Sequence, residues 1–298
     1  MILNLLLIFC SSFCCSKTEN GSTIRDVEIF KGTPAWDLAR ALDRKNIKEA
    51  TEIVKKDRSI INYQDPKFGI TLLIRSVLSE NEKAVDFLLS NKAEVNIVAK
   101  IGGTALFYAV AHSWNDVYAN EDGTYVRKLL LAGADPNIPY CSPKYEGVLS
   151  PIKCGTSPLM HATQRGMEKV RLLVEHGANI NYKTELGHTA AIKALLHNKV
   201  DVAYYLIVEK KARIDEPYYY YILGSDSIID TLHAHYPVNL LEEWLYEIGS
   251  IEHQQKMAIV EEFLKQGQDY KSIQKHPKTV ERIKQIYPNN WKYYLDNY

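Results

Sequence analysis

The feature that most constrains the fold of this chain is an internal repeat. Four stretches share one order: a glycine, then a threonine or serine, a short apolar segment with small residues, a second apolar segment, and an ending in Ala-x-x-Asn or a close relative. They cover residues 69–96, 102–137, 155–181 and 187–215. Because one such unit cannot bury its apolar face alone, the repetition predicts stacked units that cover one another.

The spacing of the equivalent hydroxyl residues fits a period of 33. Thr71 and Thr104 are 33 residues apart, and Ser157 and Thr189 are 32 apart. Thr104 and Ser157 are 53 apart, which is 20 more than the period. Twelve of the extra residues follow Asn137, and eight lie between the two predicted helices of that unit, around "WNDVYANEDGTY". Both insertions therefore fall in predicted loops, where stacked repeats tolerate them.

Each recurring residue type has a physical role in a pair of helices. The glycine accepts a positive φ in the turn that opens the unit. The hydroxyl residue can accept a helix N–H as an N-cap, and small residues let neighbouring first helices approach closely. Paired apolar residues bury the second helix, as in Leu88-Leu89, Leu129-Leu130, Leu172-Leu173 and Leu206-Ile207.

This pattern resembles the ankyrin repeat, which centres on Gly-x-Thr-Pro-Leu-His-x-Ala and ends in a Gly-Ala-Asp/Asn-x-Asn turn. The resemblance implies an all-α solenoid of helix-turn-helix repeats with β-hairpin fingers. Residues 33–69 fit an N-terminal repeat that opens with Thr33-Pro34, and residues 217–239 fit a shortened last repeat. We therefore predict about five to six repeats over 33–239, and a helical C-terminal cap without the repeat signature over 240–298.

The amino terminus resembles a bacterial lipoprotein signal. Its apolar run, Ile2 to Phe13, is about a dozen residues long, which is short of the roughly 20 that span a bilayer, and no Lys or Arg precedes it. Cys15 follows a small residue and opens a polar stretch. The resemblance implies a signal peptide over 1–14, a lipid on Cys15, a polar tether over 15–32 and a place in the bacterial cell envelope. A simple cleaved signal, which would give a secreted protein, and an uncleaved apolar terminus are the alternatives.

Two further cysteines, Cys141 and Cys154, both lie in the turn between Asn137 and Ser157 that carries the 12 extra residues. In an exported chain, one even pair in one loop predicts a disulfide, worth about 3 kcal/mol by loop closure. Such a bond would stiffen a long finger that has no core of its own. The alternative is two separate thiols in a reducing compartment.

Neither composition nor motifs point to chemistry. The 36 basic and 36 acidic residues give a formal charge of zero, so we expect no nucleic-acid partner. The sequence contains no nucleophile elbow, phosphate loop or zincin motif. We interpret His161 as a structural residue of the repeat, and the spacing of His233 and His235 does not favour a metal site. We predict no enzyme activity, catalytic residue, metal or cofactor.

We therefore predict a non-catalytic module that binds a protein, such as a periplasmic enzyme or a toxin. The resemblance places contacts on the finger tips and on the exposed ends of the first helices. The finger candidates are Lys67, Phe68, Lys100, Ile101, Glu185 and Leu186, and the groove candidates are Ser79, His112, Gln164, Arg165 and His197, while Tyr140, Tyr145 and Glu146 lie on the inserted finger.

Two interpretations stay open. Phe68, Ile101 and Leu186 either form an exposed apolar stripe or pack within their fingers. The four tyrosines from Tyr218 to Tyr221 either pack between repeats or form a contact patch. The rival function is an enzyme or a glycan-binding protein with its site in residues 216–298, which are rich in Tyr and Trp.

Overall fold

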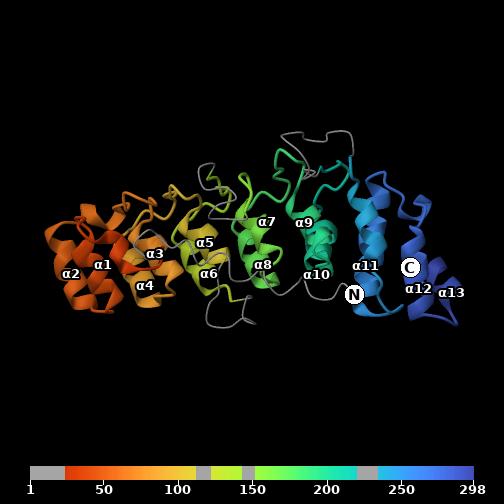
Figure 1. Cartoon of the computed structure of the whole chain (residues 1–298), viewed down its shortest axis with the longest axis horizontal. Helices are drawn as coiled ribbons and strands as arrows, with labels where there is room; N and C mark the ends of the chain where they lie inside the picture. The colour runs from red at the N-terminus through yellow and green to blue at the C-terminus, as the bar shows by residue number, and fades with distance from the viewer. Residues whose placement is uncertain (1–23, 112–121, 143–151, 220–233) are drawn as a thin grey trace. The chain divides into compact units, whose positions relative to one another are not determined.

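The computed structural model describes residues 24–111, 122–142, 152–219 and 234–298 (Figure 1). These residues fall into two compact units. Unit 1 runs up to residue 158 and also contains 171–178, and unit 2 contains 159–170 and 179–298. The described residues fold as helices with three isolated antiparallel bridges, of which Gln64–Thr71 and Tyr140–Thr156 close predicted fingers and Tyr218–His235 lies in the predicted shortened repeat. The all-α fold predicted from the repeats is confirmed.

Unit 1 is built from consecutive helix pairs that lie side by side (Figure 1). In each pair the two helices contact each other, and α3 also contacts α5 of the next pair. The elements are η2 (Val27–Phe30), α1 (Trp36–Asp43), α2 (Ile47–Lys56), η3 (Ser59–Asn62), α3 (Leu72–Leu78), α4 (Glu82–Ser90), α5 (Ala105–Ala111) and α6 (Thr124–Leu131).

Hydroxyl caps start the first helices, as the sequence predicts. The side chains of Thr71, Thr104 and Thr189 accept hydrogen bonds from the backbone N–H three residues later. Each bond satisfies one of the otherwise unpaired amides of a helix start. Thr33 differs, because α1 begins at Trp36 and the Thr33 hydroxyl donates to the Phe30 carbonyl instead. Thr33 therefore closes the turn before the helix rather than capping it.

The first helices form the core of the stack. All seven residues of α3 and all seven of α5 are buried, because the next helix pair covers the face that the second helix leaves open. The predicted alanine positions are among them, with Ala105 and Ala109 in α5 and Ala190 and Ala194 in α9 all buried. Small side chains at these places allow the close approach of neighbouring helices.

The asparagine that ends each repeat joins it to the next one. Asn62 exchanges two hydrogen bonds with Glu94, and the Asn96 side chain accepts from Asp135 N and donates to the Gly133 carbonyl. In unit 2 the Asn181 side chain accepts from Arg213 N. The asparagine that recurs at the end of each repeat therefore forms hydrogen bonds between neighbouring repeats.

Unit 2 continues the helix pairs and then changes character. The helices α7 (Pro158–Ala162) and α8 (Met167–Glu175) are each divided between the two units. They are followed by α9 (Ala190–Leu196), α10 (Val200–Tyr204), a π-helical turn η4 (Tyr205–Glu209), η5 (Pro237–Glu243), α11 (Ile251–Lys265), η6 (Tyr270–Ser272), α12 (Pro277–Ile286) and α13 (Trp291–Asn297). Most of the shortened repeat predicted over 217–239 lies outside the described residues.

Candidate functional site

The first finger of unit 1 is a tight turn built around one carboxylate. Asp65 is buried, and its oxygens accept hydrogen bonds from the backbone N–H groups of Lys67, Phe68 and Ile70 at 2.6–3.0 Å. An isolated bridge between Gln64 and Thr71 closes the turn. This geometry leaves Lys67 exposed and turns Phe68 inward.

The second finger is bonded to the first. Ile101 N donates to the Phe68 carbonyl at 3.2 Å, and the Gln64 amide donates to the Val98 carbonyl at 3.2 Å. The Lys100 ammonium donates to the Pro66 carbonyl at 2.7 Å. We call residues 64–70, 97–103 and 140–142 the finger row. One backbone hydrogen bond, and bonds from side chains to backbone carbonyls, join these segments to one another.

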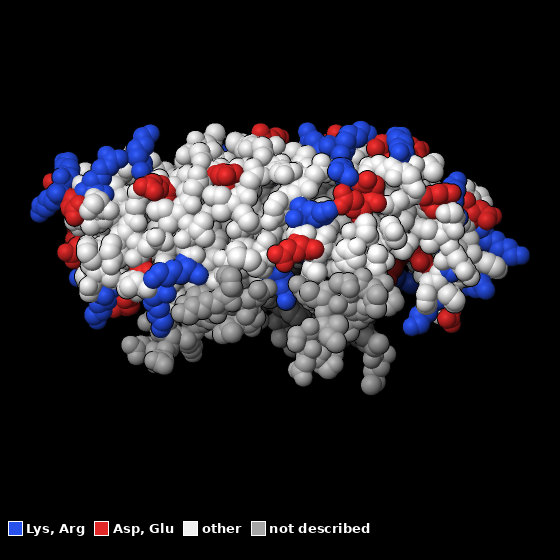
Figure 2. Space-filling model, turned by 90° about the horizontal axis from the view of Figure 1, so that it is seen from above, with Lys and Arg blue, Asp and Glu red and all other residues white. Residues whose placement is uncertain are grey.

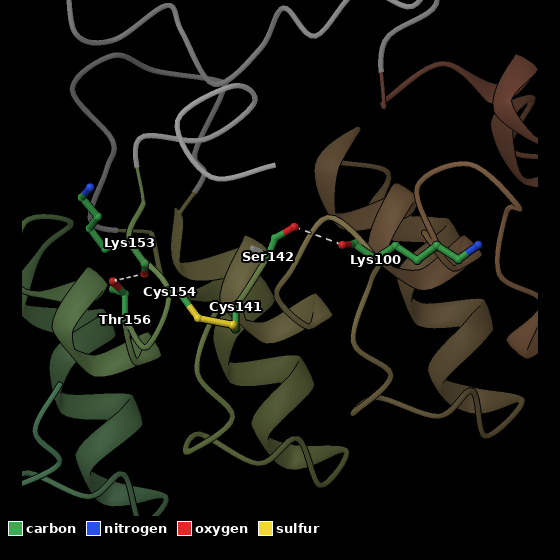
Figure 3. Close-up of a disulfide and its surroundings, with 6 residues drawn as sticks. All are labelled: Lys100, Cys141, Ser142, Lys153, Cys154 and Thr156. Carbon is green, nitrogen blue, oxygen red and sulfur yellow. Dashed lines mark hydrogen bonds between the residues drawn. A yellow bond between two sulfur atoms is a disulfide. The ribbon is translucent and has the colours of Figure 1, made fainter. Parts of the chain in front are cut away.

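The base of the inserted finger is held at several points (Figure 3). Tyr140 and the 155–156 segment pair through two backbone hydrogen bonds, and the predicted Cys141–Cys154 disulfide lies beside this pairing. The Ser142 hydroxyl donates to the Lys100 carbonyl at 3.0 Å. The inserted finger therefore begins as a direct continuation of the finger row.

Three of the predicted contact residues are buried. Phe68 is 4% exposed, Ile101 is 6% exposed and Tyr140 is 2% exposed. Tyr140 packs on Phe107 with ring centroids 5.2 Å apart. These side chains supply the apolar interior that a short hairpin needs, so for Phe68 and Ile101 the alternative of packing within the fingers holds. Leu186 is half-buried.

The exposed part of the finger row has a different composition from the one predicted. Lys67 and Lys100 are exposed as expected, and Val98 adds an apolar side chain that is 42% exposed. The sequence prediction did not include Val98. Its alternation with the buried Ala99 was the available signal, since neighbouring positions in extended chain point to opposite sides.

In unit 2 the structure brings two predicted groove residues together. Gln164 and His197 come from neighbouring repeats, and their side-chain nitrogens are hydrogen-bonded at 2.8 Å. Burial, with the nearby Lys193 and Lys199 ammonium groups, lowers the pKa of His197. The imidazole is therefore neutral at pH 7 and can accept from the amide. Of the others, Arg165 is half-buried, Glu185 is exposed, and Ser79 in unit 1 is half-buried.

Several predicted residues lie outside the described part of the chain. These are the lipidation residue Cys15, the groove residue His112 and the inserted-finger residues Tyr145 and Glu146. Among the described residues, no helix is both long enough and apolar enough to cross a bilayer.

The charges on the face shown in Figure 2 are of both signs, with a broad uncharged area among them. A mixed face of this kind gives short-range complementarity to another protein surface rather than one long-range field. In unit 2, for example, Lys183 and Arg213 both pair with Glu216.

The described residues contain no cluster of His, Cys, Asp and Glu that could hold a metal ion. The aromatic residues that could have lined a glycan site in 216–298 are used mostly for packing. Trp244 and Tyr294 are each 2% exposed, and Tyr218 is buried against His188 and His235. Among the described residues of this region, Tyr236 is 47% exposed and Tyr293 is 61% exposed.

Comparisons with known proteins agree with this architecture. Residues 117–217, about a third of the chain, match the family model described as ankyrin repeats (3 copies). One ankyrin repeat protein of fowlpox virus (strain NVSL) is 25% identical over 179 residues, which cover 59% of this chain and 36% of the relative. A second from the same virus is 30% identical over 156 residues, which cover 52% of this chain and 41% of the relative. The chain thus spans about two-fifths or less of the length of these curated relatives.

Proposed function

We propose that this chain, which carries ankyrin repeats, is a non-catalytic module that binds a protein partner. Ankyrin repeats imply protein partners in general, and the finger row gives this chain a defined surface for one. The observation that carries the proposal is the set of bonds between fingers, which fixes Lys67, Val98 and Lys100 in one array. A surface ordered before binding loses little conformational entropy when the partner docks.

We propose one contact surface in each unit. In unit 1 it is the exposed side of the finger row, which carries the apolar Val98 and the lysines Lys67 and Lys100. In unit 2 it is the Gln164–His197 pair with the exposed Glu185. Both surfaces carry many hydrogen-bonding groups and expose little apolar area. This composition is typical of a non-obligate interface.

Site-specific photo-cross-linking in the native host cell tests this proposal. A photo-reactive phenylalanine analogue is placed at Val98 or at His197, and a matched control carries it at Leu131, which is 74% exposed on α6. We expect one protein to be cross-linked from the first two positions and not from the control. Equal cross-linking from all three positions, or none from Val98 and His197, would reject the proposed surface.

We further propose that the chain is anchored in a bacterial cell envelope by a lipid on Cys15, with an envelope enzyme or a toxin as its client. The support is the apolar run of the first residues and the small residue before Cys15. Acyl chains would hold the protein at the membrane without a spanning helix. Metabolic labelling with a fatty acid that carries an alkyne is expected to mark the natural chain and not Cys15→Ala. Labelling that persists in the variant would reject the anchor.

A further inference from the structure

The C-terminal helices enclose two lysine amines in one aromatic cage. Lys256 on α11 is 0% exposed, and its ammonium group lies 3.6 Å from the Tyr298 ring centroid and 5.0 Å from that of Tyr270. Lys275, in the loop before α12, lies 3.3 Å from the Tyr270 centroid and 5.4 Å from that of Tyr298. Both amines therefore face the same pair of rings.

The oxygens that accept hydrogen bonds from the two amines are uncharged. Lys256 donates to the Trp244 carbonyl at 3.0 Å and to the Tyr270 hydroxyl at 3.2 Å. Lys275 donates to the Tyr270 carbonyl at 3.3 Å. Among the described residues, neither amine has a carboxylate within ion-pair distance. The Glu242 carboxylate, which accepts a hydrogen bond from His276 N, acts electrostatically on both amines, and Asp269 acts on Lys275.

Burial in the cage disfavours the charge on each amine, and a charged Lys275 further disfavours a charge on Lys256. Lys275 also lies just before the N-terminus of the ten-residue helix α12, where the helix dipole opposes a positive charge. The two amines differ in access, because Lys256 is fully enclosed and Lys275 is only half-buried. Of the two, Lys275 is the amine that a reagent in solution can reach.

We propose that Lys275 is a nucleophilic lysine and a site of covalent acylation by activated acyl groups of the thioester class. In the reaction the neutral Lys275 nitrogen attacks the thioester carbonyl carbon, and an amide bond forms. The carbon–sulfur bond breaks, and the departing thiolate takes up the proton that the nitrogen loses. This inference does not depend on the proposed protein-binding function.

The electrostatics agree with this role. Burial lowers the pKa of Lys256 to about 6 and the pKa of Lys275 to about 8, against the pull of Glu242 on both. At pH 7.5 a pKa near 8 leaves roughly a quarter of the Lys275 amine neutral, compared with about one-thousandth for an ordinary exposed lysine. A lower pKa also weakens the nucleophile itself, so we expect a net advantage of about tenfold.

Acylation of the full-length protein by a small thioester, S-acetyl-N-acetylcysteamine, tests the proposal. Peptide mass spectrometry gives the initial rate at each lysine, and the exposed Lys278 serves as an internal control three residues away. We expect Lys275 to react about tenfold faster than Lys278 at pH 7.5, with a rate that levels off above a midpoint near pH 8. Equal rates at the two lysines, or no midpoint below pH 9, would overturn the proposal.

A second variant separates the burial of Lys275 from the effect of the neighbouring charge. Lys256→Met removes the neighbouring amine and keeps a long apolar side chain in the cage. Because Lys256, with a pKa of about 6, is largely neutral above pH 7, we expect the Lys275 midpoint and its advantage over Lys278 to stay unchanged in the folded variant. A midpoint that rises towards that of an exposed lysine would overturn burial as the source of the reactivity of Lys275.

Discussion

Gly102 shows how tightly neighbouring fingers pack at a single residue. Its φ is +82°, and a Cβ atom placed on it would lie 2.8 Å from the Tyr140 ring and 2.9 Å from Ser142 Cβ. Gly133 also has a positive φ, of +90°, yet nothing lies within 4 Å of the equivalent Cβ position. The two glycines therefore separate the cost of backbone strain from the cost of a steric clash.

We predict that Gly102→Ala lowers the free energy of unfolding by about 2–4 kcal/mol, since it adds overpacking to the strain of a positive φ. Gly133→Ala carries the strain alone and should cost about 1 kcal/mol. Urea denaturation of both variants gives the comparison. Equal losses would mean that the fingers can separate enough to admit a methyl group.

Lys256 gives a pH prediction at the same scale. Its pKa is about 6 in the folded chain because of burial, and an exposed lysine in the unfolded chain has a pKa near 10.4. Between these values the unfolded state binds more protons, so the contribution of Lys256 to the unfolding free energy increases as the pH rises.

The variant Lys256→Met lacks this dependence. We expect it to be more stable than the natural chain at pH 7, with the difference shrinking by about 3 kcal/mol between pH 7 and pH 9.5. Chemical denaturation at the two pH values measures the shift, and Lys278→Met is an exposed control that should leave the profile unchanged. Parallel profiles for the natural chain and Lys256→Met would show that the buried amine keeps its proton.

At the scale of elements, the sequence could predict the features that repeat. The glycine, the hydroxyl cap and the small residues recur at a fixed period, and the structure confirms the caps at Thr71, Thr104 and Thr189. The direction in which Phe68 and Ile101 point could not be read from that period. It depends on the Asp65 turn and on the contact with the next finger, which are three-dimensional relations.

In the C-terminal cap, even less of the packing could be predicted. The helical periodicity over 240–298 predicted helices but not the side-chain contacts between them. The buried Lys256 has no sequence signature, because lysines at helical spacing are more often solvated. The residues that make its cage, Tyr270 and Tyr298, come from distant points of the chain and meet only in the fold.

The disulfide at the base of the inserted finger gives a prediction for that element. In the chain-entropy model, closing a loop of this size contributes about 3 kcal/mol. The backbone pairing of Tyr140 and Thr156 and the packing of Tyr140 on Phe107 do not require the bond. We therefore expect Cys141→Ser/Cys154→Ser to loosen the finger while the helix pairs stay folded.

Limited trypsin digestion of this double variant measures the effect. Cleavage after the exposed Lys153 should be at least tenfold faster than in the oxidised chain, and cleavage after Lys100 should be unchanged. Equal rates at Lys153 would mean that the backbone pairing alone fixes the base of the finger. Faster cleavage at both lysines would mean that the disulfide stabilises the whole finger row.

At the scale of the whole molecule, we expect the stability of each helix pair to depend mainly on the pairs next to it. In unit 1, α4 contacts α1, α2 and α3, and α3 contacts α5 of the next pair. In such a stack the unfolding free energy is approximately a sum of nearest-neighbour contributions. A defect in one pair is therefore expected to spread to the adjoining pairs and to fade beyond them.

Leu88→Ala tests this expectation. Leu88 is 0% exposed on α4, so the substitution leaves a cavity that should cost 2–5 kcal/mol. Hydrogen exchange followed by mass spectrometry should show reduced protection in α1–α4 and unchanged protection in α11–α13. Leu131→Ala, at a position 74% exposed, is the control and should change neither. A uniform loss of protection from α1 to α13 would instead show that the chain unfolds as one cooperative unit.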